Sequence, residues 1–157
     1  MSLFFMLKKK RRWFPPTPKF IEPENLDFVS DPVFSKRMLG DGIAILPENN
    51  QIFSPVAGKI IMLFETKHAL GIRSEEGSEF LLHIGIDTVE LQGKPFCEAV
   101  KLDDFVQCGD LLMTVNFSYI KELNYDPTLM LIATNRKIHL FRDQGLVQAH
   151  DPIFSVL

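Results

Sequence analysis

Two short runs of apolar, β-prone residues flank a polar stretch at residues 74–77, and this arrangement constrains the fold more than any other part of the chain. Runs of this kind on either side of a short loop containing Gly are typical of a β-hairpin. Each run carries one histidine, His68 in the first and His83 in the second. The sequence therefore predicts a hairpin with one histidine on each strand.

The length of the hairpin loop decides how the two histidines face each other. A loop of two or four residues pairs His68 directly with His83, and opposed residues on one face have Cβ atoms about 5 Å apart. Alternation along the strands would then place three apolar residues on the histidines' face, namely Leu70, Ile72 and Leu81. A loop of three residues would put the histidines on opposite faces. We expect the register that brings the imidazoles into contact.

Two adjacent neutral imidazoles suit phosphoryl transfer. One ring supplies a nucleophilic nitrogen, and the other supplies a hydrogen-bond donor for the phosphate oxygens. Two alternatives stay open on the residues alone. The histidines can be unrelated strand residues, one in the core and one on the surface, or they can be two ligands of an incomplete zinc site.

The length and the spacing of apolar segments predict one all-β domain. A chain of 157 residues, 46% of them hydrophobic, is long enough for a single core. Short strands are expected at 43–46, 51–65 with a break at Ser54-Pro55, 111–117, 130–134, 137–142 and 153–157. Asp31 and Pro32 are expected to open a helical turn that runs through Met38. Such even spacing indicates an antiparallel β-sandwich or barrel.

The charge is distributed unevenly along the chain. Residues 1–12 hold five Lys and Arg and no acid, whereas the remainder holds 12 Lys and Arg against 20 Asp and Glu, a net charge of −8. An acidic body excludes nucleic acid as a partner and favours a basic protein. We therefore separate a basic-aromatic tail with a Pro-rich linker, residues 1–18, from a single domain over residues 19–157.

The tail itself suits an anionic membrane surface. Residues 1–14 combine the five bases with bulky apolar and aromatic side chains, a composition found at the surface of anionic bilayers. A solvated, disordered tail is the alternative. The two cysteines, Cys97 and Cys108, match no metal spacing or disulfide framework, which indicates a cytoplasmic protein, with the tail able to bring it to the inner face of the membrane.

Five sequence motifs occur in a fixed order along the domain. They are DPVF with GDGIAI at 31–45, SPVAGKI at 54–60, FETKHA at 64–69, LLHIGIDTVEL at 81–91 and VQCGD at 106–110. With these motifs the chain resembles the glucose-type IIA proteins of the bacterial phosphoenolpyruvate-dependent sugar phosphotransferase system. The resemblance runs from about Asp31 to the C-terminus. It implies a flattened antiparallel β-sandwich with short helical turns.

The resemblance also implies a phosphotransferase component that works through phosphohistidine, without cofactor or metal. The phosphocarrier protein HPr would give a phosphoryl group to His83, which would pass it to a IIB domain. By the same resemblance His68 hydrogen-bonds the phosphate and Thr66 belongs to that network. The carbonyl of Gly85 would hold the Nδ1–H of His83, which frees Nε2 for the phosphoryl group.

Partner contacts follow from the resemblance as well. The acids Asp31 and Asp87 flank the site, and the apolar rim onto which HPr and the IIB domain dock comprises Phe34, Met38, Leu39, Phe64 and Leu81. Residues 19–30 lack the A-P-x-x-G strand that usually opens the family, so the sequence predicts an irregular segment there. The sugar is not specified.

Two other functions compete with phosphate relay. A IIA-like regulator would signal sugar supply through its phosphorylation state, using the same apolar face. A zinc peptidase of related fold is a distant third, because such enzymes use an H-x-H pair and His83 is followed by Ile84 and Gly85.

Overall fold

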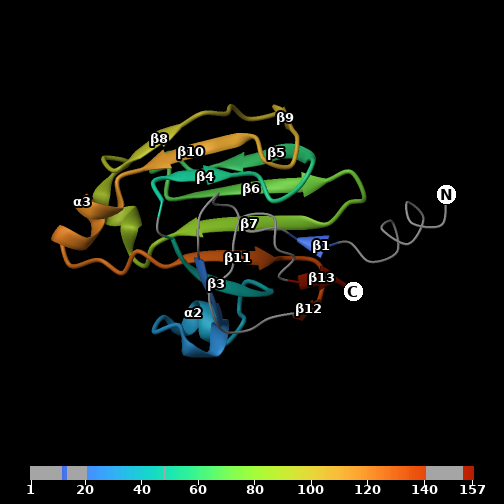
Figure 1. Ribbon diagram of the computed structural model, residues 1–157, viewed down its shortest axis with the longest axis horizontal. Helices are drawn as coiled ribbons and strands as arrows, with labels where there is room; N and C mark the ends of the chain where they lie inside the picture. The colour runs from blue at the N-terminus through green and yellow to red at the C-terminus, as the bar shows by residue number, and fades with distance from the viewer. Residues whose placement is uncertain (1–11, 14–20, 48, 141–153) are drawn as a thin grey trace.

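A computed structural model describes residues 12–13, 21–47, 49–140 and 154–157 of the chain. Its largest element is a seven-stranded antiparallel sheet with the strand order β2-β3-β11-β7-β6-β5-β9 (Figure 1). The strands are, in that order, Ile21–Asn25, Asp41–Pro47, Leu129–Ala133, Glu79–Ile84, Ala69–Ser74, Gly58–Leu63 and Phe105–Val106. The hairpin with the histidines therefore lies at the centre of the sheet.

Two small sheets accompany the large one. Strands β4 (Gln51–Phe53), β10 (Leu111–Val115) and β8 (Phe96–Glu98) form the first. Strands β1 (Arg12–Trp13), β13 (Phe154–Val156) and β12 (Ile138–Leu140) form the second. Side chains of the β4-β10-β8 sheet and of the large sheet share one apolar core, so these two sheets form a sandwich. The all-β sandwich expected from the sequence is confirmed.

The central strands bury both of their faces. Leu82 and Ile84 of β7 and Leu70 of β6 point into the sandwich core. The alternate positions, such as Leu81 of β7 and Met130 of β11, point to the other face and pack in a second, smaller cluster. This explains why the strands are apolar at successive positions, as is typical of strands covered on both sides.

Short helices cover the second face. Helix η1 (Leu26–Phe28) and helix α2 (Pro32–Ser35) precede β3 (Figure 1). Leu26 of η1, Val29 just after η1 and Phe34 of α2 complete the smaller cluster. Asp31 caps α2 by accepting the Val33 N–H at 2.9 Å, and Pro32 occupies the first helical position. The expected helical turn at Asp31-Pro32 is confirmed, although it ends before Met38.

The hairpin register differs from the one expected. Ala69, and not His68, lies opposite His83, because the loop has three residues and ends on Gly77 with a left-handed φ of 83°. The backbones of Ser74 and Ser78 close this loop with a 2.8 Å hydrogen bond. A three-residue loop with Gly in this conformation is a common hairpin turn.

The placement of apolar residues around the histidines changes with the register. Leu81 shares the face of His83, as expected, whereas Leu70 and Ile72 belong to the sandwich core on the opposite face. The expectation for Leu70 and Ile72 was therefore wrong. A shift of one residue moves every side chain of a strand to the other face, and the loop sequence allowed more than one length.

Three further differences concern element boundaries. Residues 21–25 form the edge strand β2, paired with β3 from Ile21↔Pro47 to Asn25↔Ile43, so the expected irregular segment is partly wrong. The strand expected to reach Phe117 ends at Val115, because Asn116 caps helix α3 (Phe117–Glu122). Helix η2 (Thr88–Leu91), which follows the hairpin, was not expected either.

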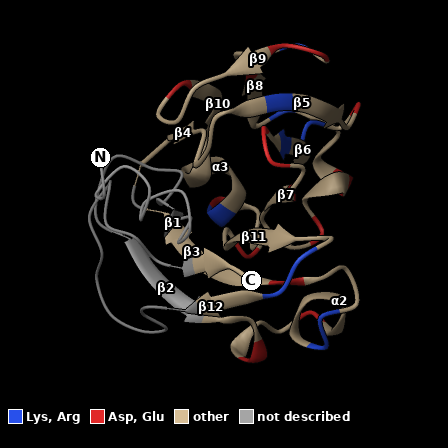
Figure 2. Ribbon diagram, turned by 90° about the vertical axis from the view of Figure 1, so that its right-hand side faces the viewer, with Lys and Arg blue, Asp and Glu red and all other residues tan. Residues whose placement is uncertain are grey.

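Most of the tail and of the last segment lies outside the described residues. This applies to 1–11, 14–20 and 141–153, so the structure describes the proposed linker and membrane-binding stretch only at Arg12 and Trp13. Over the described ranges, no helix is long and apolar enough to cross a membrane. Charged residues gather in the turns and at strand ends, while the strands β3, β7 and β11 carry few (Figure 2).

Candidate functional site

The two histidine rings are in contact despite the unexpected register. The ring centroids of His68 and His83 lie 5.1 Å apart with an interplanar angle of 77°. His68 lies just before β6, next to Lys67 with a left-handed φ of 59°, so strict alternation of side chains does not apply to it. The backbone still follows the hairpin, since the Ile84 N–H donates to the His68 carbonyl at 2.7 Å. The expected histidine contact is confirmed, although His68 reaches His83 from outside the regular strand and not as its directly opposed partner.

His68 is held on two sides. Its side chain is buried, and its Nδ1 lies 2.6 Å from the Thr66 hydroxyl. The ring of Phe64 packs against it at 5.1 Å. If the hydroxyl donates, Nδ1 is the acceptor and the Nε2 of His68 carries the proton, which makes Nε2 a hydrogen-bond donor. The structure thus brings Thr66 and His68 together, as the resemblance implied.

Both histidines are neutral at physiological pH. Burial, and next the neighbouring His68, lower the pKa of His83 from 6.5 to about 4. The backbone of Gly85 and the charge of Asp31 oppose this shift. Burial also lowers the pKa of His68. Two neutral rings allow one nitrogen lone pair to act as nucleophile while an N–H acts as donor.

The two nitrogens of His83 have different surroundings. Nδ1 is buried and forms no hydrogen bond of ordinary geometry, while the ring as a whole is partly exposed. Gly85, two residues further on, acts on this ring through its backbone and favours the protonated form. The carbonyl of Gly85 is thus close enough to influence the ring, but the hydrogen bond expected from the resemblance is not fully formed.

The two acids expected at the site occupy helix starts. Asp31 caps α2, and its negative charge raises the pKa of His83. The carboxylate is therefore close enough to His83 to interact with it electrostatically. Asp87 precedes η2 with a left-handed φ of 60° and is exposed. Asp87 is thus open to solvent, whereas Asp31 is half-buried.

The apolar rim divides into buried and exposed residues. Met38, Leu39 and Phe64 are exposed, Met38 at 69%. Phe34 and Leu81 are only 3% and 7% exposed, so the expectation that they form an exposed rim was wrong. Both belong to the smaller apolar cluster, and Phe34 packs its ring against His83 at 4.8 Å. Phe34 therefore supports the His83 ring from within the apolar cluster.

Comparison with known proteins places this site in a family. The sequence profile of the phosphoenolpyruvate-dependent sugar phosphotransferase system family EIIA 1 matches residues 22–138, which include both histidines. The chain belongs to this EIIA family.

Individual relatives agree with this assignment. The glucose-specific EIIA component of Oceanobacillus iheyensis is 41% identical over 110 residues, covering 70% of this chain and 67% of the relative. The glucose-specific EIICBA component of Streptococcus pneumoniae is 46% identical over 110 residues, covering 70% of this chain. The chain spans only 15% of that multidomain relative.

A solved structure has the same EIIA fold. The glucose permease IIA of Mycoplasma capricolum superposes with a TM-score of 0.82 at 38% identity, covering 93% of this chain and 95% of that protein. The resemblance noted from the motifs is therefore confirmed, as is the flattened antiparallel sandwich.

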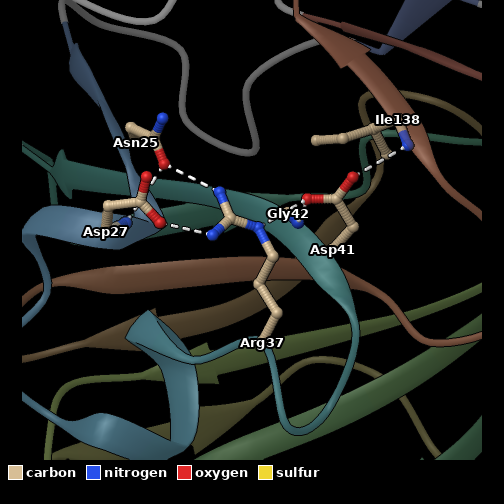
Figure 3. Close-up of polar contacts among 6 residues, drawn as sticks. All are labelled: Asn25, Asp27, Arg37, Asp41, Gly42 and Ile138. Carbon is tan, nitrogen blue, oxygen red and sulfur yellow. Dashed lines mark hydrogen bonds and ion pairs between the residues drawn. The ribbon is translucent and has the colours of Figure 1, made fainter.

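Sequence reasoning missed Arg37, which anchors the segment that follows α2. Arg37 follows α2 and binds three partners at once, as Figure 3 shows: an ion pair with Asp27, a hydrogen bond to Asn25 Oδ1 at 2.9 Å and an ion pair with Asp41 at 3.1 Å. Asp41 also accepts the Ile138 N–H at 3.1 Å. Arg37 thereby ties the segment that carries Phe34 to β2, η1 and β3. A base four residues before an acid was the only sequence signal.

The EIIA site contains few metal ligands. Among the residues that the structure describes, no group of three or more His, Cys, Asp or Glu side chains is placed to hold a metal ion. The polar groups around the histidine pair include the two imidazoles, the Thr66 hydroxyl and the backbone of Gly85.

Proposed function

We propose that this EIIA-family chain is a phosphocarrier, which accepts a phosphoryl group from phospho-HPr on His83 and passes it to a IIB domain during sugar uptake. The observation that carries the proposal is the contact of two neutral imidazoles, 5.1 Å apart, at the partly exposed end of a buried hairpin. The two rings supply the nucleophile and the donor that transfer through phosphohistidine requires.

The surroundings of His83 favour Nε2 as the nucleophile. Because Nδ1 is buried and the ring is partly exposed, Nε2 is the nitrogen that an incoming phosphoryl group can reach. Its lone pair forms the new P–N bond while the P–N bond of phospho-HPr breaks, and the proton stays on Nδ1. A pKa of about 4 keeps this lone pair free at neutral pH.

His68 serves as the partner of the phosphate. Its ring is positioned by Thr66 and Phe64, so the Nε2–H can donate to a phosphoryl oxygen without reorganisation. Donors fixed in advance are the largest single contribution in reactions that develop charge on oxygen. His68 therefore acts most strongly in the transition state.

HPr and the IIB domain dock on one surface around the histidines. Exposed apolar side chains of Met38, Leu39 and Phe64 supply its core, and Asp31 and Asp87 supply negative charge that attracts basic residues of the partner. Titration of the labelled protein with HPr should shift NMR signals of residues 31–39, 64–68 and 81–87. Shifts confined to residues 101–110 would contradict this placement.

A direct experiment tests the transfer. The protein is incubated with phosphoenolpyruvate, Enzyme I and HPr, and its intact mass is measured. We expect a gain of one phosphoryl group that is labile in acid and stable in alkali, as a phosphoramidate is. No mass gain, or a modification that survives acid, would refute the proposal.

A regulatory role uses the same surface. A IIA-like regulator would present the apolar rim to permeases or kinases only when His83 is unphosphorylated. A pull-down that compares the phosphorylated and unphosphorylated protein separates this role from relay. Partners other than HPr and a IIB domain that bind only the unphosphorylated form would favour regulation.

The N-terminal tail is proposed to meet an anionic membrane surface. Strand β1 pairs with β13 at Arg12↔Ser155, and β13 pairs with β12 at Ser155↔His139. Arg12, the last of the five bases, therefore pairs with β13, which separates it from β12. Co-sedimentation with anionic vesicles should weaken with salt and be lost on deletion of residues 1–16. Equal binding of the truncated protein would refute this contact.

A further inference from the structure

A buried threonine follows His83 by five residues in the chain. Thr88, the first residue of η2, is fully buried, and its hydroxyl donates a short hydrogen bond to the carbonyl of Ile84. Ile84 is the residue that follows His83. A buried hydroxyl usually satisfies a nearby backbone group, and here that group lies in the chain that leaves the catalytic strand.

The peptide group between Ile84 and Gly85 is fixed at both ends. Its carbonyl accepts from Thr88, and its N–H donates to the Thr128 carbonyl at 2.8 Å. A trans peptide group is planar, with its C=O and N–H pointing in opposite directions. Two bonds at opposite ends therefore leave this group no freedom to rotate.

The next peptide group contains the carbonyl of Gly85, which acts on the His83 ring although Nδ1 of that ring forms no hydrogen bond of ordinary geometry. Its N–H, from Ile86, donates to the Asp126 carbonyl at 3.0 Å. The opposite end of the same plane is the Gly85 carbonyl, which influences the His83 ring. The orientation of this carbonyl thus depends on the turn at Gly85, which starts from the peptide group that Thr88 holds.

Gly85 and the Thr88 side chain also fit together sterically. Gly85 has a left-handed φ of 75°, and a Cβ atom at this position would overlap the Thr88 methyl group and approach the Asp126 carbonyl to 3.0 Å. The methyl of Thr88 therefore occupies the space that the missing side chain leaves free. The hydroxyl and the methyl group of Thr88 therefore both contact the turn at residues 84–85.

We infer that Thr88 is a positioning residue for phosphoryl transfer: it holds the Ile84–Gly85 turn so that the Gly85 carbonyl keeps the His83 proton on Nδ1 and Nε2 stays free. The inference rests on the proposed function for its effect on transfer. Its effect on the tautomer of His83 does not require a partner protein.

The test compares three variants by two readouts. Thr88→Val keeps the shape of the side chain and removes the hydroxyl donor, whereas Thr88→Ser keeps the donor. Thr134→Val is the control. It removes a threonine hydroxyl that donates to the Glu79 carbonyl at 3.3 Å, at the other end of β11. NMR of ¹⁵N-labelled imidazole reports the tautomer of His83 in the unphosphorylated protein. Rapid-quench kinetics with phospho-HPr report kcat and KM.

We expect Thr88→Val to raise the Nε2–H fraction of His83 and to lower kcat about tenfold, as loss of a group that orients a reacting residue does, with little change in KM. Thr88→Ser and Thr134→Val should retain the wild-type tautomer and kcat. A purely structural threonine would lower the melting temperature of Thr88→Val and leave its tautomer and kcat unchanged, which would overturn the inference.

Two other outcomes are decisive as well. If Thr88→Val does not fold, Thr88→Ser still tests the role of the hydroxyl, and an altered tautomer in that variant would contradict it. If the wild-type protein takes up no phosphate, the proposed function fails, while the imidazole spectra still decide whether Thr88 sets the tautomer.

Discussion

The ring of Phe34 lies edge-on against the ring of His83, with centroids 4.8 Å apart and an interplanar angle of 60°. Phe34 comes from α2 and His83 from the central strand β7, so this contact joins the short helix to the hairpin that carries the histidines. It removes one side of the imidazole from water. Burial is the largest cause of the lowered pKa of His83.

Replacement of Phe34 should therefore affect both stability and protonation. Phe34→Ala opens a cavity in the smaller apolar cluster and should cost about 3 kcal/mol in the free energy of unfolding. It should also raise the pKa of His83 towards 6.5, because water reaches the ring. Urea denaturation and NMR titration measure the two effects. Phe28→Ala is the control, since Phe28 is 69% exposed, and an equal effect in that variant would contradict the assignment.

The lowered pKa of His83 predicts a specific pH dependence of stability. The unfolded chain binds a proton near pH 6.5, whereas the folded protein binds it only near pH 4. The contribution of the neutral His83 to the free energy of unfolding is therefore fully present above pH 6.5. It is lost as the pH falls to 4, and at 1.4 kcal/mol per pKa unit it amounts to about 3 kcal/mol. His83→Gln lacks this proton. The free energy of unfolding of both proteins is measured between pH 7 and 4. An equal loss in the wild type and in His83→Gln would contradict the prediction.

Two glycines with similar backbone angles should differ in their tolerance of a side chain. Gly77 and Gly85 have φ values of 83° and 75°, but no heavy atom lies within 4 Å of a Cβ built on Gly77, whereas one on Gly85 overlaps Thr88. Gly77→Ala should cost about 1 kcal/mol, the strain of a left-handed residue. Gly85→Ala should cost clearly more and slow phosphorylation. Thermal unfolding compares them, and equal losses would count against a tight turn.

Arg37 should act on the site through α2. Arg37→Gln removes the ion pairs with Asp27 and Asp41, and since the side chain is partly exposed we expect a loss of about 1 kcal/mol or less. NMR signals of Phe34 and His83 should nevertheless shift, because α2 loses its anchor. Arg73→Gln breaks the surface pair with Glu79 at 2.9 Å and should leave those signals in place. Identical spectra of both variants and the wild type would exclude this role.

The hairpin shows how far the sequence predicts the site. Apolar runs around residues 74–77 sufficed to predict two strands with facing histidines, and the contact of His68 with His83 is present. The register was wrong by one residue, because several loop lengths fit the same residues and only the left-handed Gly77 selects among them. The contact survives because His68 lies outside the regular strand.

Burial could not be predicted where two faces are both covered. Phe34 and Leu81 were expected at the surface, but α2 and η1 lie over the second face of the sheet and enclose them. A helix of four residues leaves almost no periodic signal in the sequence. Strand β2 was missed because Pro23 and two glutamates are unfavourable in a strand, and residues 21–25 form one through their pairing with β3.

The central claim is that His83 is the nucleophile and His68 donates a hydrogen bond to the phosphate. Phosphorylation of two variants tests this claim directly. With phosphoenolpyruvate, Enzyme I and HPr, His83→Ala should take up no phosphate, because it lacks the nucleophile. His68→Gln should still be phosphorylated, because its amide keeps a donor near the phosphate. It should pass the phosphate to a IIB domain about a hundredfold more slowly, since a misplaced donor in the transition state costs about 3 kcal/mol. Phosphorylation of His83→Ala on His68 at a near wild-type rate, together with failure of His68→Gln to accept phosphate, would contradict the account.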